Sequence, residues 1–135
     1  MSQLVYVDTN VYLDYLFNRV DRLRPLGDFA FEFFRKCIQC SYTIVISDWV
    51  LVELQKNASD KHIQSLLDWF VECNKIVWVE QSKEDVQKAK VFSHWQDRLH
   101  EILAKKAGAR YIVTRNIRDF LCSGDSIQIQ LPESM

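Results

Sequence analysis

Two kinds of apolar pattern alternate along the chain. Short β-branched runs recur at 4–7 (LVYV), 43–46 (TIVI), 75–79 (KIVWV), 111–114 (YIVT) and 127–131 (IQIQL), and longer stretches with helical spacing lie between them. The first four runs are nearly continuous in apolar residues, which is typical of strands covered on both faces of a parallel sheet. The last run alternates, which favours an edge strand. The pattern predicts an α/β fold with a central, mostly parallel sheet of about five strands and helices on both faces.

Short oxygen-bearing side chains mark the expected helix starts, because they accept hydrogen bonds from the unpaired N–H groups of a first helical turn. Ser47 precedes one such stretch. Ser82 and Ser93 are each followed three residues later by an acid or an amide, which is the spacing of a capping box. We therefore expect two helices that meet near Phe92, the second of which stops at Gly108 in the left-handed conformation.

The predicted helix over 26–40 is unusually aromatic. It contains Phe29, Phe31, Phe33 and Phe34, which cannot all lie on one ~100° wide apolar stripe. Two interpretations stay open at this point. The helix is packed between the sheet and neighbouring helices, or part of its aromatic surface faces a partner.

The composition is that of an ordinary folded domain. Of the 135 residues, 48% are hydrophobic and 26% charged, with only 3 Gly and 2 Pro, which excludes disordered, collagen-like and disulfide-rich chains. A chain of this length can bury a core without a metal or disulfide staple. No repeat or linker interrupts it, so we expect residues 1–135 to form a single domain.

Several sequence features bear on location and on zinc binding. The longest stretch without a charge, from Cys37 to Ser47, is far shorter than the ~20 apolar residues of a membrane span. The first residues do not read as a secretory signal, so we expect a cytoplasmic protein that does not contact a membrane. Cys37 and Cys40 form a C-x2-C pair, but a zinc site needs a second pair, which favours ordinary thiols.

Net charge does not identify a partner by itself. Seventeen basic and 18 acidic residues give a net charge of −1, which argues against binding of nucleic acid through overall positive charge. If several of the acids gather at one site, however, the rest of the surface becomes slightly basic. Such a surface can still meet a phosphate backbone.

Acidic residues lie near the ends of the predicted strands. Asp8 directly follows the first strand, Glu53 comes six residues after Ser47, and Asp97 and Asp119 flank the strand at 111–114. Ligand sites of open parallel sheets lie at these carboxyl ends, where converging acids repel one another and are costly to bury. A divalent cation removes both penalties. Oxygen ligands without Cys or paired His suit Mg²⁺ or Mn²⁺ better than zinc.

Each acid also has an ordinary interpretation when it is taken alone. Asp8 can cap the helix that follows it, and Glu53 can face solvent on an amphipathic helix. Asp97 can interact with a helix dipole, and Asp119 can be a solvated loop residue. A shared site explains all four acids together more simply, and Asp8 is its strongest member.

Four segments carry a resemblance to a known family: 7–16 (VDTNVYLDYL), 46–57 (ISDWVLVELQKN), 97–120 (DRLHEILAKKAGARYIVTRNIRDF) and 127–134 (IQIQLPES). Through them the chain resembles the PIN-domain ribonucleases nearly end to end, and most closely the small VapC-like toxins of type II toxin–antitoxin pairs. The fold implied by the resemblance is a single PIN-like domain.

The resemblance also implies which residues form the site. The family's three acids match Asp8, Glu53 and Asp97. Thr9 and Thr114 take the hydroxyl positions that orient the first acid and the strand end. Many relatives have Asp at the fourth position, where this chain has Asn116, and the next acid is Asp119. Because Asn offers a carbonyl oxygen but no charge, we expect any second metal to bind weakly.

The implied activity is hydrolysis of RNA phosphodiester bonds with one or two Mg²⁺ or Mn²⁺ ions. Four acids would be catalytic, and with Asn116 they would form the metal ligands: Asp8, Glu53, Asp97 and Asp119. His100, one turn after Asp97, would support them, and Arg115 and Arg118 would contact phosphate. The RNA would be read in single-stranded or loop regions.

The resemblance further implies a cognate antitoxin protein that covers the aromatic helix surface and reaches the acidic pocket with a basic side chain. A homodimer interface would explain the excess Phe equally well.

Two other enzyme classes fail on particular residues. Haloacid dehalogenase-type phosphohydrolases need D-x-D, but this chain has Asn10 two residues after Asp8. A nucleotide-binding Rossmann unit needs a glycine-rich loop after the first strand, and the glycines stand at 27, 108 and 124. The alternative from a different class is a catalytically reduced PIN domain that binds RNA or a protein, which Asn116 favours.

Overall fold

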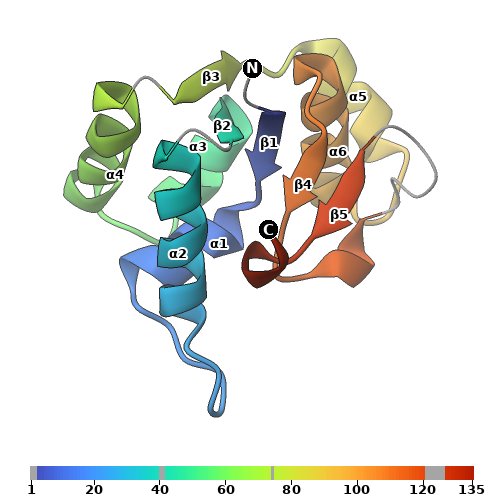
Figure 1. Cartoon of the computed structure of the whole chain (residues 1–135). Coiled ribbons are helices and arrows are strands. Elements are labelled where there is room, and N and C mark those ends of the chain that lie inside the picture. The colour runs from blue at the N-terminus through green and yellow to red at the C-terminus, as the bar shows by residue number, and fades with distance from the viewer. Residues whose placement is uncertain (1–2, 40–41, 74, 121–126) are drawn as a thin grey trace.

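A five-stranded parallel sheet forms the centre of the computed structural model, which describes residues 3–39, 42–73, 75–120 and 127–135 (Figure 1). The strands are β1 (Gln3–Val7), β2 (Tyr42–Ser47), β3 (Ile76–Val79), β4 (Tyr111–Val113) and β5 (Gln128–Gln130). Their order is β3-β2-β1-β4-β5, and every pair is parallel. The α/β class and the five-stranded sheet predicted from the apolar pattern are confirmed.

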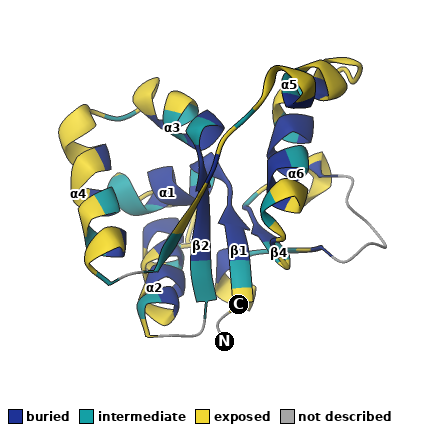
Figure 2. Ribbon diagram, turned by 90° about the horizontal axis from the view of Figure 1, so that it is seen from above, coloured by how far each residue is buried: buried dark blue, intermediate teal, exposed yellow. Residues whose placement is uncertain are grey.

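Helices cover both faces of this sheet, as predicted. Their bounds are α1 (Thr9–Leu16), α2 (Leu26–Ile38), α3 (Asp48–Gln55), α4 (Asp60–Glu72), α5 (Lys83–Lys90) and α6 (Trp95–Ala107), with short 3-10 turns η1 (Ile117–Asp119) and η2 (Pro132–Ser134). Figure 2 shows α1, α2 and α4 on one side of the strands and α5 and α6 on the other. None of the helices in the described part of the chain is long and apolar enough to span a membrane.

Most of the predicted helix ends are confirmed. The Ser47 hydroxyl accepts a hydrogen bond from the Val50 N–H, Ser82 and Asp85 form a capping box, and Gly108 ends α6 with a φ of 75°. The prediction that Ser93 caps α6 is wrong, because His94 occupies that position without a side-chain cap. The first α6 residue, Trp95, packs on Trp49 of α3, with 5.3 Å between the ring centroids.

Strand β3 departs from its predicted burial. Its apolar run predicts a strand covered on both faces, but β3 lies at the edge of the sheet, and Val77 and Trp78 are 36% and 52% exposed. A continuous apolar pattern does not distinguish a central strand from an apolar edge strand, because both present the same residue types. The predicted edge position of β5 is confirmed.

The aromatic helix α2 is only partly explained by packing. Phe33 and Phe34 are fully buried, whereas Phe31 is 42% exposed. Phe31 stacks on Tyr15 and Trp69 at 6.2 and 6.4 Å between ring centroids, and these three rings are called the aromatic surface below. Cys37 is buried in the core, while Cys40 lies outside the described residues.

The segment between α1 and α2, residues 17–25, forms a hairpin that protrudes from the body of the molecule (Figure 1). Gly27 in the first turn of α2 lets the start of the hairpin approach the helix, since a Cβ at this position would lie 2.4 Å from the Asn18 side chain. The Gly27 N–H donates to the Arg19 carbonyl at 2.9 Å. Leu23 at the tip is 97% exposed.

Candidate functional site

The candidate site lies at the carboxyl ends of β1 and β4. Strand β1 pairs with β2 on one side and β4 on the other, so the strand order reverses here, which is where open α/β sheets bind their ligands. Asp8 directly follows β1, and Thr114 directly follows β4. The Asp8 N–H donates to the Val113 carbonyl at 2.9 Å and so continues the sheet into the site.

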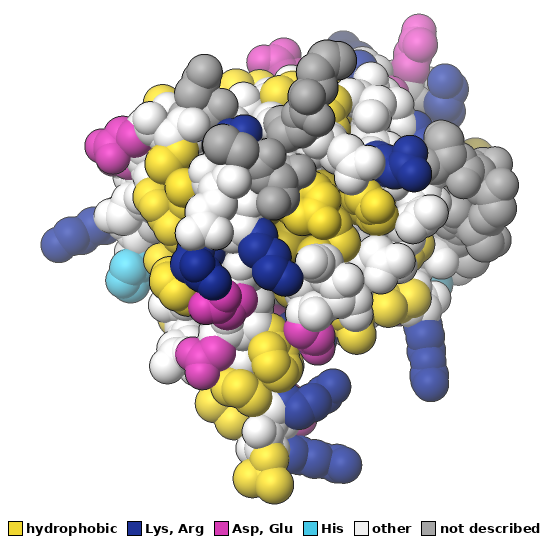
Figure 3. Space-filling view, in the orientation of Figure 1, with side chains coloured by type: hydrophobic (Ala, Val, Ile, Leu, Met, Phe, Trp, Pro, Cys, Tyr) yellow, Lys and Arg dark blue, Asp and Glu magenta, His cyan; other side chains and the backbone are white. Residues whose placement is uncertain are grey.

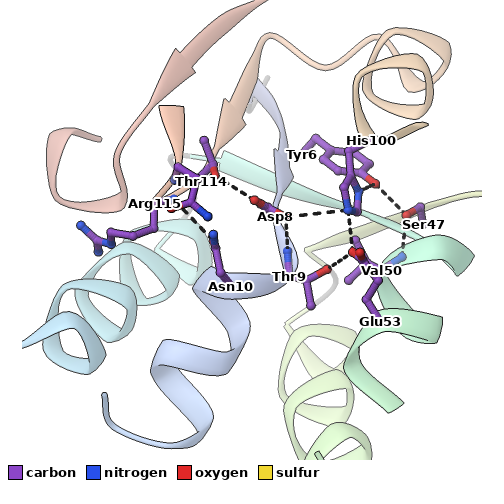
Figure 4. A network of polar contacts seen from close by, with 11 residues as sticks. Tyr6, Asp8, Thr9, Asn10, Ser47, Val50, Glu53, His100, Thr114 and Arg115 are labelled. Atoms are coloured by element: carbon purple, nitrogen blue, oxygen red, sulfur yellow. Dashed lines mark hydrogen bonds and ion pairs between the residues drawn. The ribbon is translucent and has the colours of Figure 1, made fainter. Parts of the chain in front are cut away.

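Both carboxylate oxygens of Asp8 are held in place (Figure 4). Oδ1 accepts the backbone N–H of Thr9 at 2.7 Å, and Oδ2 accepts the Thr114 hydroxyl at 2.8 Å. Burial raises the pKa of Asp8, and the hydrogen bonds and the nearby His100 offset only part of this effect. Asp8 is also the N-cap of α1. It therefore caps a helix and belongs to the group of polar side chains at the sheet edge.

Glu53 points from α3, the helix that Ser47 caps, toward Thr9 and His100 (Figure 4). Its Oε1 accepts the Thr9 hydroxyl at 2.7 Å and lies 2.6 Å from His100 Nε2. Burial raises the pKa of Glu53, but the hydrogen bond and charge of His100, followed by Thr9 and Lys56, outweigh it and lower the pKa overall. The Thr9 hydroxyl therefore orients the second acid, whereas the resemblance assigned it to the first.

His100 lies between the two acids and is only 1% exposed. Its Nε2 is 3.8 Å from Asp8 Oδ1, and its Nδ1 is 2.6 Å from the Tyr6 hydroxyl, which in turn lies 2.8 Å from the Ser47 hydroxyl. Burial lowers the pKa of His100, but the hydrogen bond to Glu53 and the surrounding negative charge raise it overall.

The chemistry of these donors fits a divalent cation. Within the described ranges, one group of His, Cys, Asp or Glu side chains has three ligand atoms within 4.8 Å of one another, and it consists of Asp8, Glu53 and His100. Ligands at adjacent corners of an octahedron lie about 3 Å apart when each is about 2.1 Å from the ion. The measured separations of His100 Nε2 from Glu53 Oε1 and from Asp8 Oδ1, 2.6 and 3.8 Å, bracket that value.

The other two predicted acids lie on the open side of the site. Asp97, on the first turn of α6, is partly buried, and its pKa is raised first by burial and then by the negative charges of Asp119 and Asp8. Asp119 is exposed at the end of η1, where its backbone carbonyl accepts a hydrogen bond from Arg98. These acids therefore influence one another electrostatically, although Asp97 and Asp119 are not in the compact group above.

The residues after β4 lead from Thr114, which contacts Asp8, to an exposed turn. The Thr114 hydroxyl accepts the Asn116 N–H at 3.0 Å, which orders the start of the turn, but Asn116 is itself exposed. A surface cavity of about 320 Å³ is lined by Arg115, Asn116, Ile117, Arg118 and Asp119.

The two predicted phosphate contacts differ. Arg115 forms two hydrogen bonds to the Glu133 carboxylate at 2.6 and 2.7 Å, and its Nε lies 3.7 Å from the buried Asp14. Arg118 is exposed, and it lines a surface cavity of about 950 Å³ with residues of the protruding hairpin: Asp21, Arg22, Leu23 and Arg24.

Sequence reasoning missed Tyr6 as a contact of His100 and Ser47 as a contact of Tyr6. Tyr6 lies within an apolar strand, and Ser47 is already explained as a helix cap, so neither position stands out in the sequence. The Asp14–Arg115–Glu133 cluster was missed for the same kind of reason. Asp14 has the spacing of an ordinary surface charge, but the structure buries it.

Comparison with known proteins supports the fold. No family model matches the chain, and a search of curated proteins finds no match. A search of solved structures finds a chain in the crystal structure of VapBC2 from Rickettsia felis bound to a DNA fragment from their promoter. The match has a TM-score of 0.59 and 20% identity, and it covers 94% of this chain and 97% of the other. The PIN-like fold implied by the sequence resemblance is thereby confirmed.

Proposed function

We propose that the protein is a metal-dependent endoribonuclease of the PIN-domain, VapC-like type that hydrolyses RNA phosphodiester bonds. The observation that carries the proposal is the pair of carboxylates of Asp8 and Glu53, which converge at the carboxyl edge of the sheet with a third ligand atom beside them. Two carboxylates this close repel one another, and a dication relieves that repulsion.

Mg²⁺ or Mn²⁺, as one ion or two, would be held by Asp8 and Glu53, with Asp97, Asn116 and Asp119 toward the open side. A bound dication lowers the pKa of a coordinated water and stabilises the charge that develops on the phosphate oxygens. Thr114 donates to Asp8 Oδ2 and Thr9 donates to Glu53 Oε1, which fixes the orientation of both carboxylates.

The RNA backbone would be held by Arg118 together with the hairpin arginines. Figure 3 shows Lys and Arg side chains beside the apolar tip of the hairpin. Arg22, Arg24 and Arg118 line one cavity there, and Arg24 also pairs with Asp21, so Arg22 and Arg118 are the main phosphate contacts of this proposal. Guanidinium groups bind phosphate through paired N–H donors. The Arg115 side chain already binds Glu133, so we assign this residue a positioning role. Its backbone N–H donates to the Asn10 side chain at 3.4 Å, which connects the turn after β4 to α1.

A partner protein, an antitoxin, would cover the aromatic surface. Tyr15 and Trp69 line a small cavity of about 170 Å³ between α1 and α4, next to the exposed Phe31. The solved structure with the same fold is a VapBC2 assembly, which supports a protein partner for this chain as well. Native mass spectrometry of the isolated chain distinguishes this surface from a homodimer interface, since a homodimer would be observed without any partner.

The test of the proposed function is RNA cleavage by protein freed of any bound partner. We expect single-stranded RNA to be degraded with Mn²⁺ and cleavage to stop when a chelator is added. Asp8→Asn should abolish cleavage while the circular-dichroism spectrum of the fold is unchanged. Cleavage by Asp8→Asn at the wild-type rate would contradict the role of Asp8.

A second candidate function is a catalytically reduced PIN domain that binds RNA or a protein without cutting. Asn116 favours it, because an amide at this position adds no charge for a second ion. RNA binding in a gel-shift assay without cleavage at any Mn²⁺ or Mg²⁺ concentration would select this alternative.

A further inference from the structure

We propose that His100 is a direct ligand of the metal ion, so that the site presents one imidazole nitrogen beside the carboxylates and favours Mn²⁺ over Mg²⁺. The inference rests on the metal site of the proposed function. It adds His100 as the ligand that makes this site prefer Mn²⁺. In the described part of the chain, His100 Nε2 is the nitrogen that belongs to the compact group of ligand atoms.

The position of His100 is the first argument. The ring is 1% exposed and lies beside the rings of Tyr6 and Trp49, at 5.5 and 6.2 Å between centroids, so it has little freedom to turn away. Its Nε2 lies near carboxylate oxygens that come from two other elements, the β1 end and α3. An ion placed among Asp8, Glu53 and His100 therefore meets the nitrogen without a change of ring orientation.

The hydroxyl contacts behind the ring allow both protonation patterns that such a ligand needs. When Nε2 carries the proton, it donates to Glu53, and Tyr6 donates to Nδ1. When Nε2 binds an ion, Nδ1 carries the proton and donates to Tyr6, which then donates to Ser47. The same heavy-atom positions serve both arrangements, because a hydroxyl group can donate or accept. Metal-binding histidines commonly donate their second N–H in this way.

The ligand type determines the metal preference. Mg²⁺ prefers oxygen ligands and gives up its water reluctantly, whereas nitrogen ligands bind later divalent metals of the first transition row increasingly well. A site with two carboxylates and one imidazole therefore selects Mn²⁺ over Mg²⁺ more strongly than a site with carboxylates alone. The same preference extends to Co²⁺, which gives an independent spectroscopic probe.

Pulsed electron paramagnetic resonance of the Mn²⁺-loaded full chain tests the assignment directly. We expect modulation from a coordinated ¹⁴N nucleus, which changes to the ¹⁵N pattern when histidine is isotopically labelled. His100→Gln should remove this signal and weaken Mn²⁺ binding by at least about tenfold. Loss of a group that only orients a metal ligand already has an effect of that size. His62→Gln is the matched control, because His62 is exposed on α4 and contacts Ser59.

A second variant keeps the inference testable if His100→Gln fails to fold. Tyr6→Phe leaves the imidazole in place and removes the hydroxyl that contacts Nδ1, so it should retain the nitrogen signal and weaken Mn²⁺ binding by about tenfold. Mn²⁺ bound by the wild type without nitrogen coupling would overturn the inference, whether or not RNA is cleaved, and so would the absence of Mn²⁺ binding. Nitrogen coupling without any RNA cleavage would instead support the ligand and contradict the proposed nuclease.

Discussion

The two sides of the candidate site differ in how far the fold alone determines them. On the closed side, Asp8 and His100 are 8% and 1% exposed. Asp8 accepts the Thr114 hydroxyl, and His100 contacts the Tyr6 hydroxyl. On the open side, Asn116 and Asp119 are exposed around a 3-10 turn. Asp97, also toward the open side, is partly buried, and after burial the negative charges of Asp119 and Asp8 raise its pKa.

This difference indicates a division of tasks. The closed side is preorganised, because turning any of its side chains would leave a buried polar group without a partner, which is costly. The open side has no such constraint and can adjust to an ion or a phosphate. Substitutions on the closed side should therefore have large effects on metal binding and cleavage, and those on the open side smaller effects.

Asp8→Asn should have the largest effect. The substitution removes a negative charge and puts an amide nitrogen where an oxygen ligand stands. Loss of a group that only orients a metal ligand lowers metal affinity or activity by about 10- to 100-fold. Loss of the ligand itself should therefore reduce the cleavage rate more than about 100-fold. Steady-state cleavage of a fluorescent single-stranded RNA measures it, with circular dichroism as the fold control. A tenfold loss or less would mean that the closed side is not the centre of the reaction.

Thr114→Val should have the next largest effect. Valine keeps the shape of the side chain but removes the hydroxyl that donates to Asp8 Oδ2 and accepts from the Asn116 N–H. We expect Mn²⁺ affinity, measured by calorimetry, to fall by about 10- to 100-fold. Thr114→Ser is the matched control, since it restores the hydroxyl and should recover most of the affinity. Equal affinities of the valine and serine variants would contradict this role.

The closed side also shows how far sequence reasoning reached into the site. Asp8 was predictable because a strand that ends in an acid is a local pattern, and the caps at Ser47 and Ser82 are local as well. The contact of His100 with Tyr6 joins residues 94 positions apart. Nothing in the spacing of either residue predicts that contact, because it depends on how α6 packs against the sheet.

The fold divides in the same way. Helix ends and the number of strands follow from patterns within a few residues, and these predictions were confirmed except for the cap of α6. The edge position of β3 and the burial of Asp14 follow from which elements pack beside them, and the sequence predicted neither. Arg115 belongs to no periodic pattern, and its contact with Glu133 differs from the phosphate contact that was expected of it.

The pH dependence of stability provides a third test of the closed side. The raised pKa of His100 means that the folded chain holds this proton more tightly than the unfolded chain does. Its contribution to stability is fully present below the ordinary histidine pKa of 6.5 and is lost as the pH rises through the raised value. The raised pKa of Asp8 acts in the same direction and the lowered pKa of Glu53 in the opposite one, both starting from ordinary values in the acid range.

We therefore expect the unfolding free energy of the metal-free chain to fall as the pH rises above 6.5, by about 1.4 kcal/mol for each pKa unit by which His100 is raised. Urea denaturation in the presence of a chelator measures this slope. His100→Gln should flatten it, whereas His62→Gln should leave it unchanged. A slope that persists in His100→Gln would assign the effect to another group.

The smallest effect is expected from Asp119→Asn on the open side. Burial, the main cause of the raised pKa of Asp97, remains in this variant, while the repulsion from Asp119 is removed. The pKa of Asp97 should therefore fall toward its ordinary value of 3.8, as a carboxyl-carbon NMR titration can measure. Cleavage should decrease less than the 10- to 100-fold typical of groups that orient a metal ligand, roughly a few-fold, because Asp119 is solvated and lies outside the compact ligand group. A loss as large as that of Asp8→Asn would show that the exposed turn is ordered during the reaction and that the two sides of the site act as one unit.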